Sequence, residues 1–508
     1  MQISSRKFMT RAVGFSLILA SLVSLLFLSD VLTEKQGTRK LRVMVKKLIK
    51  KVNTLSPAPP QAIRIPLDSA IHGDVKFEKI ALANTTDRHS SLTMGPDGKL
   101  YASTVDGRIK RFPVKADGTL GDPQIIYALQ DAYGKRTPRL TIGLTFDPAA
   151  TADSLVAWVT HSSFAFINGP DWDGKLTRLS GPDLQTVQDV LVHLPRSAKD
   201  HLTNSIAFGP DGALYFSQGS NSAMGKEDEK WGNRKEHLLS GAILRLDTDK
   251  LAMLPALPLD VKTSEGGSYN PYAADAPLTI FASGIRNAYD LLWHSNGQLY
   301  VPTNGSNPGG NTPASVAGTR RMDGSVYDGP EVPELMDILQ DQHDFLFRVE
   351  KGGYYGHPNT ERGEFVMNGG NPTDEKDPAE LEDYPVGTLP DANWRGFSFQ
   401  FPLHASPNGI IEYKGNAFNG ELKRKILIVR YVNNKDIIVL EPGGSKKDIV
   451  KKSEGTSIPG FWGFAVPIDL TEDVRTGNIY VSEFAGDGQI SLLRPLCKDT
   501  QQIVVHVK

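Results

Sequence analysis

His201 is the residue whose type and position first point to chemistry. It lies in SAKDHLTNSIAFGPDGALYFSQG, residues 197–219, immediately before a run that alternates apolar and polar residues. A neutral imidazole accepts a proton near pH 7, so a histidine at the start of a strand is a candidate general base. A solvated or capping loop residue is the other interpretation, and at this stage both remain open.

The elements that must position His201 recur along the chain. A polar turn followed by a short alternating strand appears six times, and Asp-Gly or Asn-Gly turns between such runs are typical of hairpins. Six copies with few helical stretches predict an all-β fold, a six-bladed β-propeller over roughly residues 60–497. We expect a short helix in VPELMDILQ from Val332, inside an insertion. The six copies begin at Gly95, Phe146, Phe208, His294, Phe418 and Thr471.

The first 55 residues differ in composition from the rest of the chain. Arg6, Lys7 and Arg11 precede an uncharged run over residues 12–28, and the basic segment KQGTRKLRVMVKKLIKK follows. A basic stretch before an apolar one is typical of a signal peptide or signal anchor, so we expect an exported protein. If the segment is retained, the membrane is a partner. SPAPPQ, from Ser56, is interpreted as a linker, and residues 498–508 as a C-terminal tail.

Charge and cysteine content argue against a nucleic-acid-binding protein and against a fold held by intrachain disulfides. The formal net charge is −2, without the basic stripe that proteins use to follow phosphates, so we expect no nucleic acid as partner. Cys497 is the only cysteine of the 508 residues, so the chain cannot form an intrachain disulfide. The oligomeric state is not indicated.

Five segments resemble soluble quinoprotein glucose dehydrogenases and the related sorbosone and aldose-sugar dehydrogenases. They occur in the family's order and span about residues 140–490. The resemblance implies a propeller that oxidises a sugar or sugar-like alcohol with pyrroloquinoline quinone (PQQ) and calcium as cofactors. Besides the segment around His201, the matching stretches are IGLTFDPAATADSLVAWVTH from Ile142, GIRNAYDLLWHSNGQLYVPTNGSN from Gly284, GGYYGHPN from Gly352 and HASPNGIIEYKGNAF from His404.

The resemblance also implies roles for single residues. His201 would be the catalytic base that removes the sugar's hydroxyl proton while a hydride moves to the quinone. Arg286 and Asn287 would contact the quinone, and Lys414 would bind one of its carboxylates. Two plainer interpretations stay open: Arg286 pairs with an acidic residue at the surface, and Lys414 is a solvated turn residue.

The backbone carbonyls of Gly305 and Ser306 would bind calcium, because a hard cation prefers oxygen ligands. The family usually has Gly-Pro here, and the change to Gly-Ser is mild because a carbonyl needs no particular side chain. The plainer interpretation is that Gly305 only permits a tight turn after Asn304.

Two departures from the family pattern concern charge. A Gly-Asp pair usually follows the strand after the base, and its carboxylate helps to set up the histidine; this chain has Gly219-Ser220. The last blade usually begins with Arg-x-Arg-Asp, whose arginines hold the quinone. Trp462 and Phe464 stand there instead. Stacking on a flat ligand or on a sugar face is one interpretation of these two residues, and filling of the core is the one we expect. Losing two charged hydrogen bonds, each worth about 1.5–3 kcal/mol, would weaken binding of an anionic cofactor.

Two other functions therefore stay open beside the dehydrogenase. A non-catalytic propeller that binds a protein or a glycan agrees with the missing arginines and carboxylate. A calcium-dependent, lactonase-like hydrolase would need amides and carboxylates from several blades to meet at a metal. Its candidate ligands are Asn204, Asn287, Asn304 and Glu483.

Overall fold

The structure, a computed structural model, describes residues 67–71, 73–322, 324–373 and 376–496. These residues belong to the unit of the chain that begins at Leu67. The predicted signal or anchor segment (1–55), the SPAPPQ linker and the tail (498–508) lie outside the described residues. None of the helices in the described part of the chain is long and apolar enough to cross a membrane.

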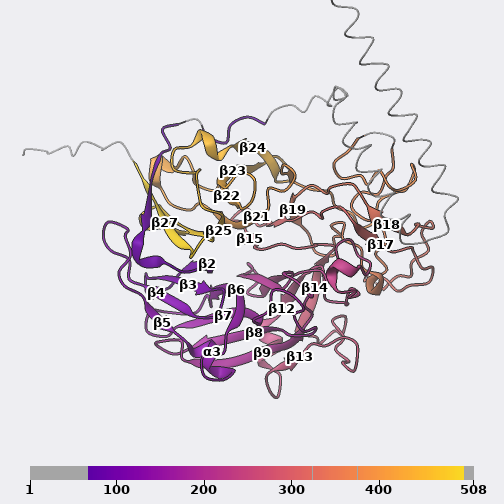
Figure 1. The fold of residues 1–508 in the computed structure, drawn as a ribbon, viewed down its shortest axis with the longest axis horizontal. Helices are drawn as coiled ribbons and strands as arrows, with labels where there is room; N and C mark the ends of the chain where they lie inside the picture. The colour runs from indigo at the N-terminus through magenta and orange to yellow at the C-terminus, as the bar shows by residue number, and fades with distance from the viewer. Residues whose placement is uncertain (1–66, 72, 323, 374–375, 497–508) are drawn as a thin grey trace, which may run out of the picture. The chain divides into compact units, whose positions relative to one another are not determined.

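Six β-sheets surround a common centre and form a six-bladed β-propeller, as the repeats predict (Figure 1). In each blade the first strand faces the centre and the later strands follow outward. The first three blades are β2 (His89–Met94), β3 (Leu100–Thr104), β4 (Ile109–Phe112) and β5 (Gln124–Ile126); β6 (Arg139–Phe146), β7 (Val156–Ser163), β8 (Gly174–Ser180) and β9 (Thr186–Leu194), joined by β13 (Leu259–Asp260); and β10 (Thr203–Phe208), β11 (Leu214–Gln218), β12 (Ala242–Leu246) and β14 (Leu278–Ser283).

The last three blades complete the ring, and the sixth closes it. Its outermost strand, β1, comes from the start of the described chain, and pairs antiparallel with β27 from Phe77 opposite Pro495 to Leu82 opposite Ile490. These blades are β15 (Leu292–Trp293), β16 (Leu299–Thr303), β19 (Phe345–Val349) and β20 (Phe399–Gln400); β21 (Pro407–Glu412), β22 (Ile426–Arg430), β23 (Asp436–Gly443) and β24 (Asp448–Ser453); and β25 (Pro467–Asp473), β26 (Asn478–Glu483), β27 (Gln489–Pro495) and β1 (Phe77–Leu82).

The repeated turns show why these residues form hairpins. In the first blade Gly98, at φ +72°, donates its N–H to the carbonyl of Gly95, and the Tyr101 hydroxyl donates to Asp97 at 3.1 Å. A glycine at this positive φ avoids the strain that a side chain would meet. The third and fourth blades repeat the arrangement with Gly212 and Gly297. The turn and the aromatic residue of each copy therefore hold the two inner strands of a blade in register.

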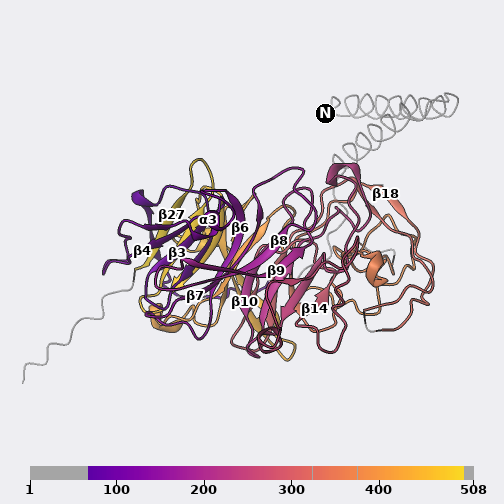
Figure 2. The ribbon, with the colours of Figure 1, turned by 90° about the horizontal axis from the view of Figure 1, so that it is seen from below.

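An insertion between β16 and β19 corrects one prediction. The segment from Val332 was expected to contain a helix, but Leu335–Ile338 is a strand, β18, paired with β17 (Gly310–Thr312). The segment is a strand because β17 pairs with its backbone. Ile338 is buried in the apolar cluster of the insertion. This small sheet lies at the rim of the ring (Figures 1 and 2). The described helical segments are short: η1 (Ala83–Thr85), α3 (Ala128–Ala132), η2 (Glu229–Trp231), α4 (Thr248–Ala252), η3 (Thr360–Arg362), η4 (Ala417–Gly420) and η5 (Gly455–Ser457).

Candidate functional site

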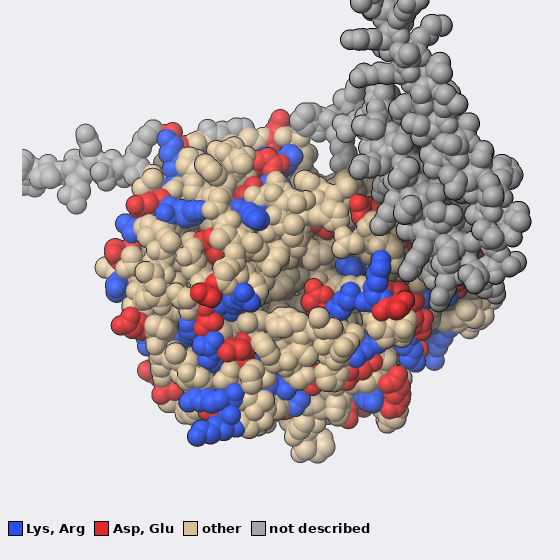
Figure 3. All heavy atoms as spheres, in the orientation of Figure 1, with Lys and Arg blue, Asp and Glu red and all other residues tan. Residues whose placement is uncertain are grey.

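His201, Arg286 and Trp231 gather where the chain enters the inner strands. His201 lies two residues before β10, Arg286 lies in the loop between β14 and β15, and Trp231 ends η2 in the loop between β11 and β12. The amide of Ser220 donates to the carbonyl of Arg286 at 2.8 Å, which ties two of these loops together. The space-filling view shows a hollow near the centre of the ring, with acidic and basic side chains along its edge (Figure 3).

Arg286 is the cation of this site. Its Nε donates to the carbonyl of Ala223 at 2.9 Å and its Nη1 to the carbonyl of Gly305 at 3.1 Å. Within the described residues no carboxylate lies at ion-pair distance from it. Burial lowers its pKa to about 10, while more distant acidic groups, Asp200 foremost, oppose the shift. The guanidinium therefore stays charged at neutral pH, and its hydrogen bonds go to carbonyls alone.

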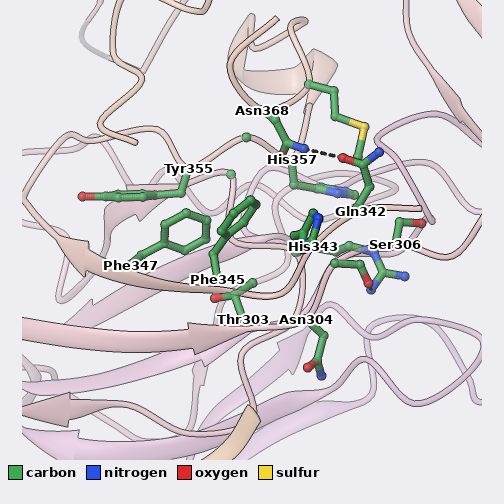
Figure 4. Close-up of a pocket in the computed structure, with 15 residues that line it drawn as sticks. Thr303, Asn304, Ser306, Gln342, His343, Phe345, Phe347, Tyr355, His357 and Asn368 are labelled. Carbon is green, nitrogen blue, oxygen red and sulfur yellow. Dashed lines mark hydrogen bonds between the residues drawn. The ribbon is translucent and has the colours of Figure 1, made fainter. Parts of the chain in front are cut away.

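Arg286, Gly305 and Ser306 line one cavity. Figure 4 shows the rings of Phe345, Phe347 and Tyr355 along one side of it and His343, His357 and Ser306 on the other. The centres of water molecules can reach about 30 Å³ of this cavity. Since one water needs about 10–15 Å³, there is room for two or three water molecules and not for a sugar or a tricyclic quinone.

The two carbonyls that the resemblance assigns to calcium already take part in hydrogen bonds. The carbonyl of Gly305 accepts from Arg286, and that of Ser306 accepts from the amide of Gln342 at 3.0 Å. Each keeps one lone pair, because a carbonyl oxygen has two. The amide of Gly305 donates to Asp344 at 2.8 Å, which makes Asp344 the carboxylate beside this loop. No cluster of three or more His, Cys, Asp or Glu suited to a metal occurs in residues 67–496 as described.

His201 is buried and oriented by Ser220. Its Nδ1 lies 3.1 Å from the carbonyl oxygen and 3.0 Å from the hydroxyl of Ser220. Because the carbonyl only accepts, Nδ1 carries the proton and Nε2 is the accepting nitrogen. Burial, followed by the charge of Arg286, holds the pKa of His201 well below its usual range, so the ring is neutral at pH 7. Gly219 packs so closely that a Cβ there would lie 2.7 Å from the His201 Cβ.

Trp231 covers His201. Their ring centroids are 4.2 Å apart, and the guanidinium of Arg286 and the ammonium of Lys199 lie 5.5 and 5.0 Å from the indole. Trp231 is itself buried, and its amide donates to Asp228, the residue before η2. A flat ligand that lay against this face of the imidazole would therefore have to displace the indole.

The structure places Asn287 beside these residues but Lys414 away from them. Asn287 accepts from the amide of Asn204 at 2.9 Å and so ties β10 to the loop before β15. Lys414 is exposed and follows the C-terminal end of β21. Ser406 precedes the N-terminal end of the same strand, and its amide donates to Asp344, the carboxylate beside Gly305. β21 has six residues, about 20 Å of strand, between the two ends.

The two aromatic residues that precede the last blade, Trp462 and Phe464, differ in burial. Phe464 is buried in the core with Lys79 4.6 Å from its ring, as expected. The expectation that Trp462 fills the core is wrong, because its side chain is 55% exposed. Neither residue supplies the cation that the family pattern has there.

Glu236 and His357 form a buried pair that was not predicted from the sequence. His357 lies in GGYYGHPN, and its Nε2 is 3.0 Å from a carboxylate oxygen of Glu236. Both side chains are almost fully buried, and His357 lines the same cavity as Arg286. The Gly-His-Pro of the matched segment was the available signal, but its partner lies 121 residues away.

Comparisons with known proteins agree with the resemblance. The Strictosidine synthase-like N-terminal family matches residues 91–112, in the first blade. Quinoprotein glucose dehydrogenase B of Acinetobacter calcoaceticus is 24% identical over 255 residues, which cover 46% of this chain and 49% of that protein. The HIPL1 protein of Arabidopsis thaliana is 28% identical over 170 residues, 32% of this chain and 21% of that one. The chain thus spans half or less of the curated relatives it matches.

Solved structures share the fold at low sequence identity. A glucose dehydrogenase superposes with a TM-score of 0.52 at 14% identity, covering 82% of this chain and 99% of the other. The PQQ domain of pyranose dehydrogenase from Coprinopsis cinerea, in its holo form, gives 0.51 at 12% identity, covering 86% and 99%. The predicted likeness to quinoprotein sugar dehydrogenases is confirmed in sequence and in fold.

Proposed function

We propose that this chain is an exported quinoprotein-type sugar dehydrogenase that oxidises an aldose or a sugar-like alcohol. One observation carries the proposal. Arg286 is a partly buried guanidinium without a carboxylate partner among the described residues; it lines a cavity, and both it and His201 lie against the indole of Trp231. A partly buried cation whose hydrogen-bond partners are all carbonyls favours an anionic ligand such as the cofactor that the resemblance implies, since such a pair forms strong charge-assisted hydrogen bonds.

The residues present fit the charge of PQQ, and the space depends on Trp231. Arg286 would bind a quinone or carboxylate oxygen, and Gly305 and Ser306 would offer calcium their remaining lone pairs. The cavity that Arg286, Gly305 and Ser306 line has room for water alone. Separately, the Trp231 indole lies against the ring of His201, so it has to turn away before a tricyclic group can lie against that face of the ring. Bound there, PQQ would supply the two-electron acceptor for a hydride.

The chain's own groups then position the substrate and hold its proton. His201 is neutral at pH 7 and presents Nε2 as an acceptor, since Ser220 holds the Nδ1 proton. A hydroxyl donating to Nε2 would be aligned for proton transfer. The charge of Arg286 beside it disfavours a second positive charge on this imidazole.

A second candidate is a non-catalytic propeller that binds a protein or a glycan. The observation that favours it is the contact of Trp231 with His201, because it closes the position that a cofactor would need. The hydrolase is less well supported: Asn204 and Asn287 bond to each other, and Glu483 accepts from the amide of Ala465 and the hydroxyl of Ser491.

Titration of the purified protein with PQQ and CaCl₂ separates these functions. We expect saturable uptake of PQQ, followed by absorbance, and reduction of a dye in the presence of D-glucose, D-xylose or other aldoses. Arg286→Gln should weaken PQQ binding about 10- to 100-fold, the effect of one or more charged hydrogen bonds. Arg178→Gln, an exposed arginine on β8, is the matched control and should bind as the wild type does.

Three results would contradict the dehydrogenase. Uptake that is the same in Arg286→Gln and the wild type would remove the residue on which the proposal depends. Calcium binding with cleavage of a lactone and no uptake of PQQ would establish the hydrolase. If the wild-type protein neither takes up PQQ nor oxidises a sugar nor cleaves a lactone, the non-catalytic binding propeller is the function that remains.

A further inference from the structure

The connection from β7 to β8 exposes a cluster of large apolar side chains. Phe164, Phe166 and Ile167, the apolar tip, are 43%, 49% and 74% exposed. The two phenyl rings lie edge to face with 5.3 Å between their centroids, so they shield each other only in part. Isolated apolar residues are common on protein surfaces, but apolar groups gathered in one place mark a contact with another molecule or with a membrane.

Arg196 and Arg234 hold the backbone on both sides of the apolar tip. The Arg196 side chain is fully buried, and its guanidinium donates to the carbonyl of Ser163 at 2.8 Å and to the carbonyl of Ala165. Arg234 donates to the carbonyl of Gly169. Because these carbonyls are fixed by buried or partly buried guanidinium groups, the fold itself exposes the tip, and fraying of the loop does not account for it.

The apolar tip lies at the same end of the ring as His201. β7 ends at Ser163, which pairs with Arg139, the first residue of the inner strand β6. The β7–β8 connection is therefore at the end where the inner strands begin. The amide of Gly169 donates at 3.1 Å to the carbonyl of Ala198, three residues before His201. A surface that contacts the tip thus lies beside the loops that carry the candidate site.

The shape and composition of the apolar tip suit lipid better than a dissolved sugar. Its three side chains line none of five well-formed cavities in the described part of the chain. Small ligands bind in clefts or pockets, so side chains outside them are poorly suited to a sugar. Phenyl and aliphatic side chains are the groups that peripheral proteins bury at the boundary between lipid headgroups and acyl chains.

The sequence before residue 67 supplies a reason for lipid to be near. The uncharged run over residues 12–28 is typical of a signal anchor, and the basic segment KQGTRKLRVMVKKLIKK is typical of stretches that bind anionic headgroups. Residues 29–66 join this run to the propeller and can span at most about 130 Å when fully extended. If the run is retained, the propeller stays within this distance of a bilayer.

We propose that Phe164, Phe166 and Ile167 insert among the headgroups and acyl chains of a phospholipid membrane and so dock the second blade on its surface. The inference goes beyond the proposed dehydrogenase and does not depend on it, because none of the three residues belongs to the site around Arg286. A membrane in contact with the tip lies beside the end of the ring that carries His201. Docking therefore fixes how the candidate site is oriented to the bilayer.

Quenching by brominated lipid tests the insertion. The full-length protein with Phe166→Trp is mixed with vesicles of phosphatidylethanolamine and phosphatidylglycerol in equal parts, with or without bromine on the acyl chains. The wild type, measured in the same way, gives the emission of the native tryptophans. We expect the emission of the added indole to shift to shorter wavelength on both kinds of vesicle and to be quenched by the brominated one, because the indole then lies at the acyl boundary.

Val474→Trp is the matched control. Val474 is 50% exposed, close to the 49% of Phe166, and it follows β25 at the end of the ring opposite the apolar tip. Both variants keep the N-terminal segment, so tethering alone affects them equally. We expect neither a shift nor quenching in Val474→Trp. Adding Phe164→Ser and Ile167→Ser to Phe166→Trp should reduce the quenching, because two of the three apolar groups are then lost.

Three results would overturn the proposal. Emission from Phe166→Trp that brominated vesicles leave unchanged would show that the apolar tip stays in water. Equal quenching of Phe166→Trp and Val474→Trp would show that vesicles meet the ring without a preferred face. A shift caused by dissolved maltotriose and not by vesicles would assign the tip to a glycan instead.

Discussion

The indole of Trp231 touches both side chains that the proposed chemistry needs, His201 and Arg286. An aromatic ring over a guanidinium is favourable, by about 0.5–2 kcal/mol depending on burial. Trp231 is held through η2, whose amide at Trp231 bonds to Asp228. A ligand that displaces the indole must therefore replace these contacts with its own.

Replacing Trp231 with alanine should open the site. We expect the apparent affinity for PQQ to rise about tenfold or more, because binding no longer requires the indole to be moved away from His201 first. The free energy of unfolding should fall by about 3 kcal/mol, because a buried tryptophan is lost. Absorbance titration and urea unfolding measure the two effects. Trp462→Ala, at an exposed position, is the control and should change neither. Weaker PQQ binding in Trp231→Ala would show that the indole belongs to the binding site.

Residues in short segments that lead into an inner strand were singled out from the sequence, and residues in the long loops were not. His201 lies two residues before β10 and Arg286 lies in the loop that leads into β15, so the propeller brings them to one mouth. Glu236 and His357 come from long connections between strands, and their contact depends on how those loops pack. Lys414 was linked to its strand correctly, but it follows the outgoing end of β21, and a motif match does not distinguish the two ends of a strand.

At the scale of elements, the inner strands approach one another closely at equivalent positions. Gly409 in β21 packs against β25, and a Cβ on it would lie 2.6 Å from the Oδ1 and 2.7 Å from the Cα of Asp469. Gly143 in β6 meets Ser205 of β10 in the same way, at 3.0 Å from its Cα. The turns of each blade were predictable because their glycines are local. These inner glycines serve contacts between blades, which no local pattern reveals.

Gly409→Ala should therefore destabilise the ring. The added methyl group meets backbone that cannot move without shifting a neighbouring blade, and overpacking of this kind costs about 1–3 kcal/mol. Urea unfolding at pH 7 measures the change. Gly73→Ala is the matched control, because a Cβ there would meet nothing closer than 3.9 Å. Equal stability of the two variants would mean that β21 and β25 separate easily.

At the scale of the molecule, the six inner strands surround two acidic residues. Asp290 accepts from the amide of Ile410 at 3.0 Å, and Asp469 accepts from the amide of Leu92 at 2.6 Å, in each case from the following blade. Burial raises the pKa of both, that of Asp290 to about 6, and the charge of Asp290 further raises the pKa of Asp469. The carboxyl groups at the centre of the ring thus stay protonated to a higher pH than exposed carboxyl groups do.

The raised pKa of Asp290 predicts a pH dependence of stability. Its ordinary pKa is 3.8, so the unfolded chain ionises first as the pH rises. The contribution of Asp290 to the free energy of unfolding should be full below about pH 4 and lost as the pH rises through about 6. Asp290→Asn should make this fall smaller, which urea unfolding between pH 4 and 8 would detect, while Asp469, whose pKa is also raised, still contributes a fall of the same sign. Asp153→Asn, at an exposed position, should keep the wild-type profile. A fall of undiminished size in Asp290→Asn would contradict the assignment.

The pairing of β1 with β27 has a consequence for the order in which the protein is made. β1 leaves the ribosome before any blade, yet its partner strand is among the last described segments. At about 5–20 residues per second, roughly 400 residues of synthesis separate them, a delay of about 20–80 s. During that time the backbone groups of β1 that later join the ring have no β27 to bond with. A chaperone that shields this stretch would therefore act on the nascent chain earliest and longest, before the propeller can close.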